Sequence, residues 1–538
     1  MHIDRRPRVL QWIAAVAIAF ALCFSTGVRA QQNIDEDDEE APKPSFDILE
    51  YRVEGNTVLP AIDIERAVYP YLGPGRNIDD VQSAAQALEK TYQTSGYLTV
   101  LVGIPEQKVA DGVVVLQVTE GTLDRLRVQG ARYYSAGHIR ALVPSLKEGE
   151  VPYFPDVQKD LAVLNRPADR KVAPVLKPSM VPGQVDIDLK VDDKSPLHGS
   201  IELNNRYTAN TEPLRLSAAV RYDNLWQRQH SASVQVLTSP QDTSQVRVIS
   251  GNYVFNPGGK DNILALYAVR SDTDVATPSA SIVGRGTITG ARYIVPLPAR
   301  GEVAHSVTLG ADYKDFKESE RRFAVNNLLP PISYVPLSGG YTAQKRGKKG
   351  VSTFNLGTTF GMRDFFGNTD DEFAARRFGA HANFFIVRGD AQRDQILGRG
   401  YTLFLRIAGQ TASGPLVNTE QYFAGGVDTV RGYLEAETLG DDALAVRVEL
   451  KSPSLAKRVG NGVDELNAIA FFDAAEVRVQ QPLVPIPGRT RLSSAGLGLR
   501  ARGPGNLAAS LDLAWPFEST PRTNAGDMRV HFRVAYDF

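Results

Sequence analysis

The sequence predicts two α+β repeats followed by an all-β transmembrane barrel of about sixteen antiparallel strands. Three observations predict this fold: an apolar N-terminal segment, one internal repeat, and a long region of alternating side chains. From residue 196 to residue 538, apolar and polar residues alternate in segments of roughly ten residues, the length that a tilted strand needs to cross a bilayer. Because alternation puts successive side chains on opposite faces of a strand, one face suits lipid and the other suits water.

The N-terminus has the pattern of an export signal. Three arginines (Arg5, Arg6 and Arg8) precede an apolar stretch over residues 9–24, which small residues follow. Residues 1–30 are therefore predicted to be a cleaved secretory signal peptide. A transmembrane anchor is the alternative, but the apolar stretch is shorter than the ~20 residues that a spanning helix needs. Residues 31–44 are predicted to be an acidic disordered linker, because like charges repel.

Composition limits the chemistry. The formal net charge of −1 argues against a nucleic-acid partner. The only cysteine, Cys23, lies in the predicted signal, so the exported chain has no thiol for catalysis or metal binding. The seven histidines show no metal-ligand spacing, and neither a phosphate-binding loop nor a Gly-x-Ser-x-Gly elbow occurs. We therefore expect no enzyme, no cofactor and no metal.

The internal repeat has a spacing of about 75 residues and defines two predicted domains, 45–121 and 122–195. It is visible when Val53-Glu54-Gly55 is aligned with Val128-Gln129-Gly130. In the first copy a strand leads to a short helix over residues 62–71 and then to a longer helix that Asn77 can cap. Two strands, 97–104 and 113–118, complete the unit, and the second copy repeats this order.

The predicted barrel, residues 196–538, contains one long stretch without a strand pattern and ends on a regular strand. The stretch without the pattern, 413–439, falls between the eleventh and twelfth alternating segments. The last segment alternates six apolar positions with polar ones and ends on Tyr536, Asp537 and Phe538. An aromatic C-terminal residue after such a segment resembles the outer-membrane insertion signal, so Tyr536 and Phe538 are its candidate residues.

Several short motifs carry a resemblance to a known family. The central loop contains Val430-Arg431-Gly432-Tyr433, which resembles the Val-Arg-Gly-Tyr/Phe motif of outer-membrane polypeptide transporters. Four other motifs are similar to those of two-partner secretion transporters of the haemolysin secretion/activation type: Asn165-Arg166, Val175-Leu176-Lys177-Pro178, Leu203-Asn204-Asn205-Arg206-Tyr207-Thr208 and Asn224-Leu225-Trp226. The two repeats likewise resemble polypeptide-transport-associated domains.

The resemblance implies a channel in the outer membrane of a Gram-negative bacterium, with its N-terminal domains in the periplasm. Such a channel recognises one secreted client protein, here expected to be large and β-helical, and passes it outward unfolded without nucleotide hydrolysis. Outer-membrane lipid and the machinery that inserts barrels are the other expected partners. The alternative within the superfamily is a factor that inserts other barrels. A plain porin is disfavoured by the repeats and the inward loop.

The family also places the loop arginine against an aspartate of strand thirteen, in a Phe-x-Asp-x-Gly motif. Here that motif reads Phe471-Phe472-Asp473-Ala474-Ala475, so the expected partner of Arg431 is Asp473, while alanine replaces the final glycine. We expect Val430, Arg431, Gly432 and Tyr433 to anchor the loop.

In the first repeat, the strand over residues 97–104 is expected to be an exposed edge that accepts an extended client by strand addition. The candidate client-binding residues lie on this strand and on the helix beside it: Tyr97, Leu98, Val100, Val102, Leu88 and Tyr92. The alternative is that the repeats are structural spacers.

Overall fold

A computed structural model describes residues 44–109, 111–209, 211–258, 261–272, 285–317, 319–320, 328–459 and 462–538. The predicted signal peptide and the linker up to residue 43 lie outside the described residues. The chain forms two compact units. Among the described residues, the first unit holds 44–122 together with Val151–Phe154 and Val181–Gln184, and the second unit holds the others.

The first repeat is a three-stranded sheet packed against two helices. Its elements are β1 (Phe46–Ile48), β2 (Glu50–Glu54), α2 (Ala61–Val68), η1 (Tyr69–Tyr71), β3 (Gly73–Arg76), α3 (Ile78–Thr94), β4 (Val100–Gly103) and β5 (Val113–Glu120). The sheet order is β2-β5-β4, with β2 parallel and β4 antiparallel to β5. Since β5 lies in the centre, both β2 and β4 are edge strands.

Helix α3 follows the sequence pattern closely. The Asn77 side chain accepts hydrogen bonds from the N–H groups of Asp79 and Asp80, and the Asp80 carboxylate accepts one from the Asn77 N–H. This capping box satisfies amides that would otherwise lack partners, which is typically worth about 1 kcal/mol. Gly96, with φ of +101°, follows the end of the helix. The predicted cap and stop are therefore confirmed.

The second repeat has the same element order. Its elements are β6 (Thr122–Gln129), α4 (Ala136–Ala141), α5 (Phe154–Leu164), β7 (Arg170–Pro178) and β8 (Gln184–Asp193). The sheet order β6-β8-β7 matches that of the first repeat. Gly55 and Gly130 have nearly the same positive φ, +86° and +87°. A β-carbon at either position would collide with a carbonyl of the central strand, Val118 or Val191. Both copies therefore need glycine where the first strand ends.

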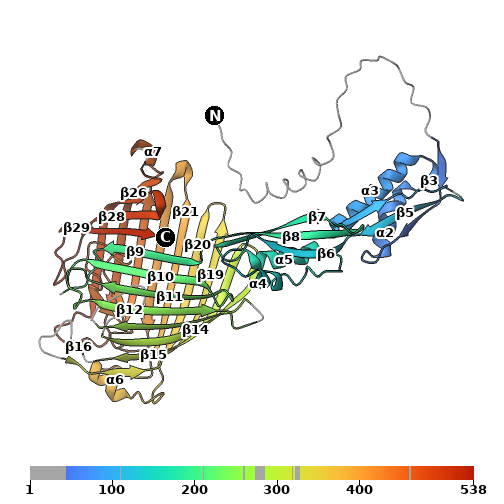
Figure 1. Ribbon diagram of the computed structural model, residues 1–538. Helices are drawn as coiled ribbons and strands as arrows, with labels where there is room; N and C mark the ends of the chain where they lie inside the picture. The colour runs from blue at the N-terminus through green and yellow to red at the C-terminus, as the bar shows by residue number, and fades with distance from the viewer. Residues whose placement is uncertain are drawn as a thin grey trace. The chain divides into compact units, whose positions relative to one another are not determined.

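Residues from Leu197 onward form a closed antiparallel barrel of sixteen strands, which confirms the predicted fold class (Figure 1). In chain order the strands are β9 (Leu197–Asn204), β10 (Arg215–Leu225), β11 (His230–Thr238), β12 (Arg247–Phe255), β13 (Ile263–Ser271), β14 (Gly286–Arg300), β15 (Val303–Phe316), β18 with β19 (Ile332–Tyr334 and Leu337–Gly347), β20 (Gly350–Phe360), β21 (Phe385–Ile396), β22 (Thr402–Ala412), β25 (Asp442–Lys451), β26 (Glu465–Arg478), β27 (Arg489–Arg502), β28 (Leu507–Pro516) and β29 (Arg529–Asp537). β18 and β19 are counted together because both pair with β15 in one register. Strand β29 pairs with β9 and closes the barrel.

The two faces of the barrel wall differ as the alternation predicts. On β15, Leu309 and Tyr313 are 59% and 46% exposed and face outward. Asp312, between them in sequence, is buried and accepts two hydrogen bonds from the Arg292 guanidinium at 2.6 and 2.8 Å. Inward positions thus carry ion pairs, and outward positions carry apolar side chains that lipid can cover. No helix within the described ranges is long and apolar enough to cross a membrane.

Candidate functional site

The candidate site is the loop between β22 and β25, the eleventh and twelfth strands, where the sequence places it. The loop contains a short hairpin of β23 (Tyr422–Ala424) and β24 (Thr438–Gly440). Every residue from Val430 to Glu437 is buried. A loop this thoroughly covered by the barrel must satisfy its polar groups with protein partners.

The structure places Arg431 against Asp473 of β26. Both side chains are fully buried. Nε of Arg431 donates to Oδ2 of Asp473 at 2.7 Å, and Nη2 donates to Oδ1 at 2.8 Å. The Arg431 N–H donates to Oδ2 as well, at 3.2 Å. This two-pronged pairing fixes orientation as well as distance, because the guanidinium fork matches the carboxylate.

The pair belongs to a larger charge cluster in which acidic and basic groups balance. Arg431 Nη2 lies 2.8 Å from Oε1 of Glu449, and its Nη1 lies 3.9 Å from Oδ1 of Asp512. The Arg431 guanidinium carbon also lies 3.5 Å from the ring centroid of Phe471, a cation–π contact. Three guanidiniums and three carboxylates make up the cluster: Arg431, Arg447, Arg500, Asp473, Glu449 and Asp512.

Gly432 turns the loop beside this cluster. Its φ is +91°, and a β-carbon there would press on Pro516 at 3.3 Å. The Gly432 N–H donates to Nε2 of His531 at 2.9 Å, and its carbonyl accepts from Nε of Arg529 at 3.2 Å. Glycine is needed here because an L side chain rarely adopts this φ and would lack room.

Val430 and Tyr433 anchor the loop by apolar packing. Both are fully buried in a cluster with Ala424, Ala445, Ala475, Val477 and Leu492. The Tyr433 hydroxyl donates to the Glu518 carbonyl at 2.9 Å and accepts from the Glu518 N–H at 3.1 Å. Ala475, where the family has glycine, packs its methyl group into this cluster and leaves the Arg431 pairing intact.

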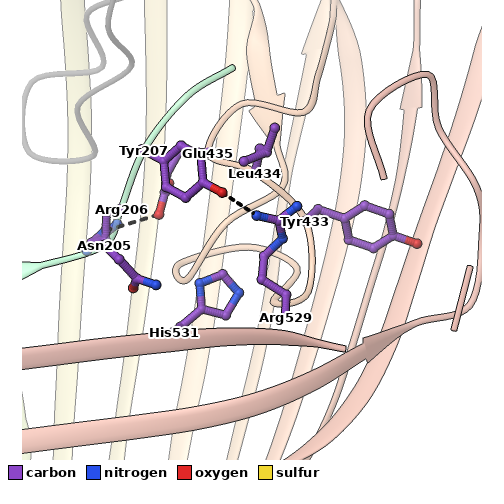
Figure 2. Close-up of a pocket in the computed structure, with 8 residues that line it drawn as sticks. All are labelled: Asn205, Arg206, Tyr207, Tyr433, Leu434, Glu435, Arg529 and His531. Atoms are coloured by element: carbon purple, nitrogen blue, oxygen red, sulfur yellow. Dashed lines mark hydrogen bonds and ion pairs between the residues drawn. The ribbon is translucent and has the colours of Figure 1, made fainter. Parts of the chain in front are cut away.

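A second polar anchor, which sequence reasoning missed, holds the loop to the segment that follows β9. Nε of Arg206 donates to Oε1 of the buried Glu435 at 3.1 Å, and Nη2 pairs with Asp428. Figure 2 shows Glu435 beside Arg206, and Arg529 beside the Tyr207 hydroxyl. Nη1 of Arg529 donates to that hydroxyl at 2.9 Å. Arg206 lies inside a motif quoted above, but no spacing in the sequence indicates that Glu435 is its partner.

In the first repeat, the structure corrects the predicted client pockets. Leu88 and Tyr92 are fully buried in the core of the repeat, as is Val100. They cannot offer pockets to a client in this structure, because the helix face that carries Leu88 and Tyr92 is buried against the sheet. The amphipathic pattern of the helix was correct, and its interpretation as a client surface was wrong.

The edge itself remains, but it is shorter than predicted. Strand β4 covers only four residues and pairs with β5 alone. Leu98 is exposed, while Tyr97 and Val102 are half-buried against the core. Oε2 of Glu89, on α3, accepts a hydrogen bond from the Val102 N–H at 3.3 Å. This contact covers one amide of the edge.

The predicted insertion signal lies on the outer face of the last strand. Tyr536 and Phe538 are 45% and 57% exposed, and their ring centroids are 6.0 Å apart. Phe538 exchanges backbone hydrogen bonds with Gly199 of β9, both at 2.9 Å. A β-carbon on Gly199 would collide with the Phe538 ring.

Within the described residues, three potential metal ligands come together where sequence spacing showed none. His198 Nε2 lies 2.7 Å from Oδ2 of Asp169 and 3.5 Å from Oδ2 of Asp223. Asp223 is already engaged, because it accepts from Arg221 at 2.9 Å and from Ser231 at 2.6 Å. These three side chains therefore form a hydrogen-bonded network of charged groups with Arg221 and Ser231. Nearby, burial in the second repeat is the main cause that raises the pKa of Tyr134 to about 12.

Two families match separate parts of the chain. Residues 46–121 match the family described as POTRA domain, ShlB-type, where POTRA stands for polypeptide-transport-associated. Residues 333–501 match the family described as haemolysin secretion/activation protein ShlB/FhaC/HecB. The second match includes the loop and Asp473.

Curated relatives agree. The heme/hemopexin transporter protein HuxB of Haemophilus influenzae strain 86-028NP is 19% identical over 84% of this chain and 79% of its own length. The outer membrane transporter CdiB of Dickeya dadantii is 23% identical over 76% of this chain and 72% of its own length. These findings confirm the resemblance and indicate an outer-membrane transporter.

Solved structures share the fold. CdiB from Escherichia coli superposes with a TM-score of 0.61 at 21% identity, covering 94% of this chain and 93% of that one. BamA from Haemophilus ducreyi lacking POTRA domains 1–3 gives a TM-score of 0.58 at 15% identity, covering 92% and 100%. At these identities the likeness concerns the fold alone.

Proposed function

Since the chain belongs to the two-partner secretion transporters of the haemolysin secretion/activation type, we propose that it recognises one secreted client in the periplasm and passes it to the cell surface. The client crosses the barrel unfolded, and its folding outside makes return unfavourable. No nucleotide is hydrolysed. By the chemistry of strand addition, a client with a long β-helical pattern suits the exposed edge of the first repeat.

The observation that carries this proposal is the way in which the loop is held inside the barrel. Its anchors are ion pairs and hydrogen bonds between the loop and the barrel wall, such as Arg431 with Asp473 and Arg206 with Glu435. Each such contact contributes on the order of 1–3 kcal/mol net, so the loop can be displaced one anchor at a time without unfolding the strands. A barrel that passes a polypeptide must be able to move this loop out of its lumen.

Strand β4 supports the recognition step. It is an edge strand that carries Leu101, which is 60% exposed, and Leu98 just before the strand is 48% exposed. An extended client segment adding to this edge would gain backbone hydrogen bonds and cover both leucines. The Glu89 carboxylate must leave the Val102 amide for such a strand to pair fully.

The experiment is reconstitution of export with a candidate client, chosen as a large secreted protein with a β-helical pattern encoded beside this gene. Proteoliposomes that contain the purified transporter, and no nucleotide, should move the unfolded client into a protease-protected space. The matched control is the same vesicle with an unrelated porin. A strict requirement for nucleotide would contradict the mechanism.

The alternative, a factor that inserts other barrels, is tested in the same strain. Deleting the gene should leave the abundance of unrelated outer-membrane barrels unchanged while the client disappears from the medium. A general fall in barrel abundance would instead favour the insertion role.

A further inference from the structure

The loop between β20 and β21, residues 361–384, is a structured element and contains helix α6 (Asp370–Arg376). Thr369 caps the helix, since its hydroxyl accepts from the Glu372 N–H while Glu372 accepts from the Thr369 N–H. Asn368 is buried and donates to the Met362 carbonyl at 2.8 Å, and Asp370 accepts from the Ala382 N–H at 2.8 Å. These internal bonds give the loop a defined shape.

The loop lies at the end of the barrel opposite to the start of β9, since β20 is an odd-numbered strand, the ninth. The second repeat leads directly into the start of β9. With that end in the periplasm, loop 361–384 opens toward the cell exterior. The arginine loop, which follows the eleventh strand, begins at the same end.

An apolar cluster packs loop 361–384 against inward-facing residues of the barrel wall. The loop contributes Phe373, Ala380, Ala382 and Phe384, all buried. The barrel wall contributes inward-facing residues from six strands, and the start of the arginine loop contributes two more: Val248, Val269, Ile288, Phe316, Ile332, Tyr334, Ile386, Leu416 and Val417. Apolar side chains inside a lumen exclude water, so the cluster has the composition of a seal.

One buried ion pair fastens this loop to the base of the arginine loop. Nη1 and Nη2 of Arg377 donate to the two carboxylate oxygens of Asp441 at 2.5 and 2.6 Å. Asp441 is fully buried and also accepts from the N–H groups of Leu416 at 2.9 Å and Gln480 at 2.7 Å. A single carboxylate thus joins three loops of the outer end.

A second buried carboxylate fixes the arginine loop to the wall at the same level. Glu420 accepts from Lys314 of β15 at 2.5 Å and from the Tyr334 hydroxyl at 2.8 Å. The Tyr334 ring lies edge-on to Phe373, with ring centroids 5.3 Å apart. The seal and the arginine loop are therefore in direct contact.

We propose that loop 361–384 is the element that closes the outer end of the lumen, and that Arg377 is a positioning residue which ties it to the arginine loop through Asp441. Displacing the arginine loop breaks the Asp441 contacts and releases the closing loop, so both move together when a chain passes. The coupling to passage rests on the proposed function, whereas the closure does not.

The test is ion conductance of the purified protein in planar lipid bilayers, with no client present. Arg377→Ala and Asp441→Asn should each raise the open-channel conductance several-fold, because the closing loop loses its anchor. The matched control is Arg363→Ala, which removes an ion pair with Asp370 in the same loop at a half-exposed site and should leave conductance unchanged. The charge-reversed pair Arg377→Asp with Asp441→Arg should restore part of the closed behaviour.

A deletion keeps the test decisive if a point variant fails to fold. Residues 361 and 384 are joined by a hydrogen bond from the Gly361 N–H to the Phe384 carbonyl at 2.8 Å, so residues 364–381 can be replaced by a short Gly-Ser turn. This variant should conduct strongly while it keeps heat-modifiable mobility. Wild-type conductance in a correctly inserted deletion variant would overturn the closure. High conductance together with normal client export would support closure of the lumen by loop 361–384. It would contradict the proposal that this loop and the arginine loop move together during passage.

Discussion

Arg431 shows how one side chain positions a loop in a charge-balanced interior. Two guanidiniums and three carboxylates surround it, so the cluster as a whole holds three charges of each sign. Removing one of them leaves an uncompensated charge in a covered site. Breaking a buried pair by removing one partner typically costs about 3–5 kcal/mol, whereas removing both costs less. That energy is too small to prevent folding of a sixteen-strand barrel, and large enough to shift a loop.

At this scale we predict the effect of separating the pair. Arg431→Ala and Asp473→Ala should each reduce client secretion strongly while the abundance of the folded barrel is largely kept. The double variant should be little worse than either single variant, because it restores charge balance. Arg431→Lys should also be impaired, since an ammonium cannot donate to both carboxylate oxygens in a fixed plane.

The measurement is secreted client in the medium, normalised to heat-modifiable barrel in the membrane. If the two single losses add in the double variant, the residues do not act as a pair.

The barrel strands show how an alternating sequence pattern produces one face suited to lipid and one face suited to the lumen. Strand β15 exposes Leu309 and Tyr313 outward and directs Gly310 and Asp312 inward, where a β-carbon on Gly310 would meet Arg292 and Ser338. Contact with lipid thus determines the residue type at every second position. Contacts with side chains on neighbouring strands determine the residue type at the inward positions.

Cysteine scanning of this strand tests the wall, because the only cysteine of the sequence, Cys23, lies in the predicted signal peptide. Thr308→Cys and Gly310→Cys should react with a membrane-impermeant thiol reagent, whereas Val307→Cys and Leu309→Cys should not, since lipid covers them. Lys314→Cys is also expected to react, more slowly, because Glu420 and the apolar cluster cover that position. Reaction read by gel shift with equal rates at adjacent positions would rule out the strand assignment.

At the scale of the whole molecule, the chain combines two different architectures. The repeats offer strand edges, while the barrel offers a lumen occupied by loops held by polar anchors. The two repeats share a sheet order and a glycine at the end of the first strand. In our proposal, recognition and passage belong to separate parts of the chain and should be separable by mutation.

Deleting residues 46–121 should therefore abolish client export and leave a membrane-inserted, heat-modifiable barrel. Recognition is lost with the first repeat, whereas the barrel keeps its closed sheet and its C-terminal strand. Client in the culture medium and barrel mobility on gels are the two readouts. Normal client levels after the deletion would show that the first repeat is a spacer.

The sequence by itself determined the features that depend on local periodicity and on short motifs. These are the strand period of 2 in the barrel, the helix period and cap in α3, the two glycines of the repeat, and the position of the arginine loop between strands eleven and twelve. Each of these features depends on residues close together in the sequence, because side-chain direction repeats every two residues in a strand and every 3.6 residues in a helix. The Arg431 contact with Asp473 could be expected only through the family motifs.

Only the tertiary structure decided which side chains meet across the lumen and which apolar face is core. Arg206 and Glu435 are 229 residues apart, and Arg377 and Asp441 are 64 apart, so no local pattern relates them. Leu88 and Tyr92 have the spacing of a helix face, but spacing cannot tell whether that face packs on its own sheet or remains open to a client. Closure of the barrel brings distant charges into a covered space, where burial makes each of them need a partner.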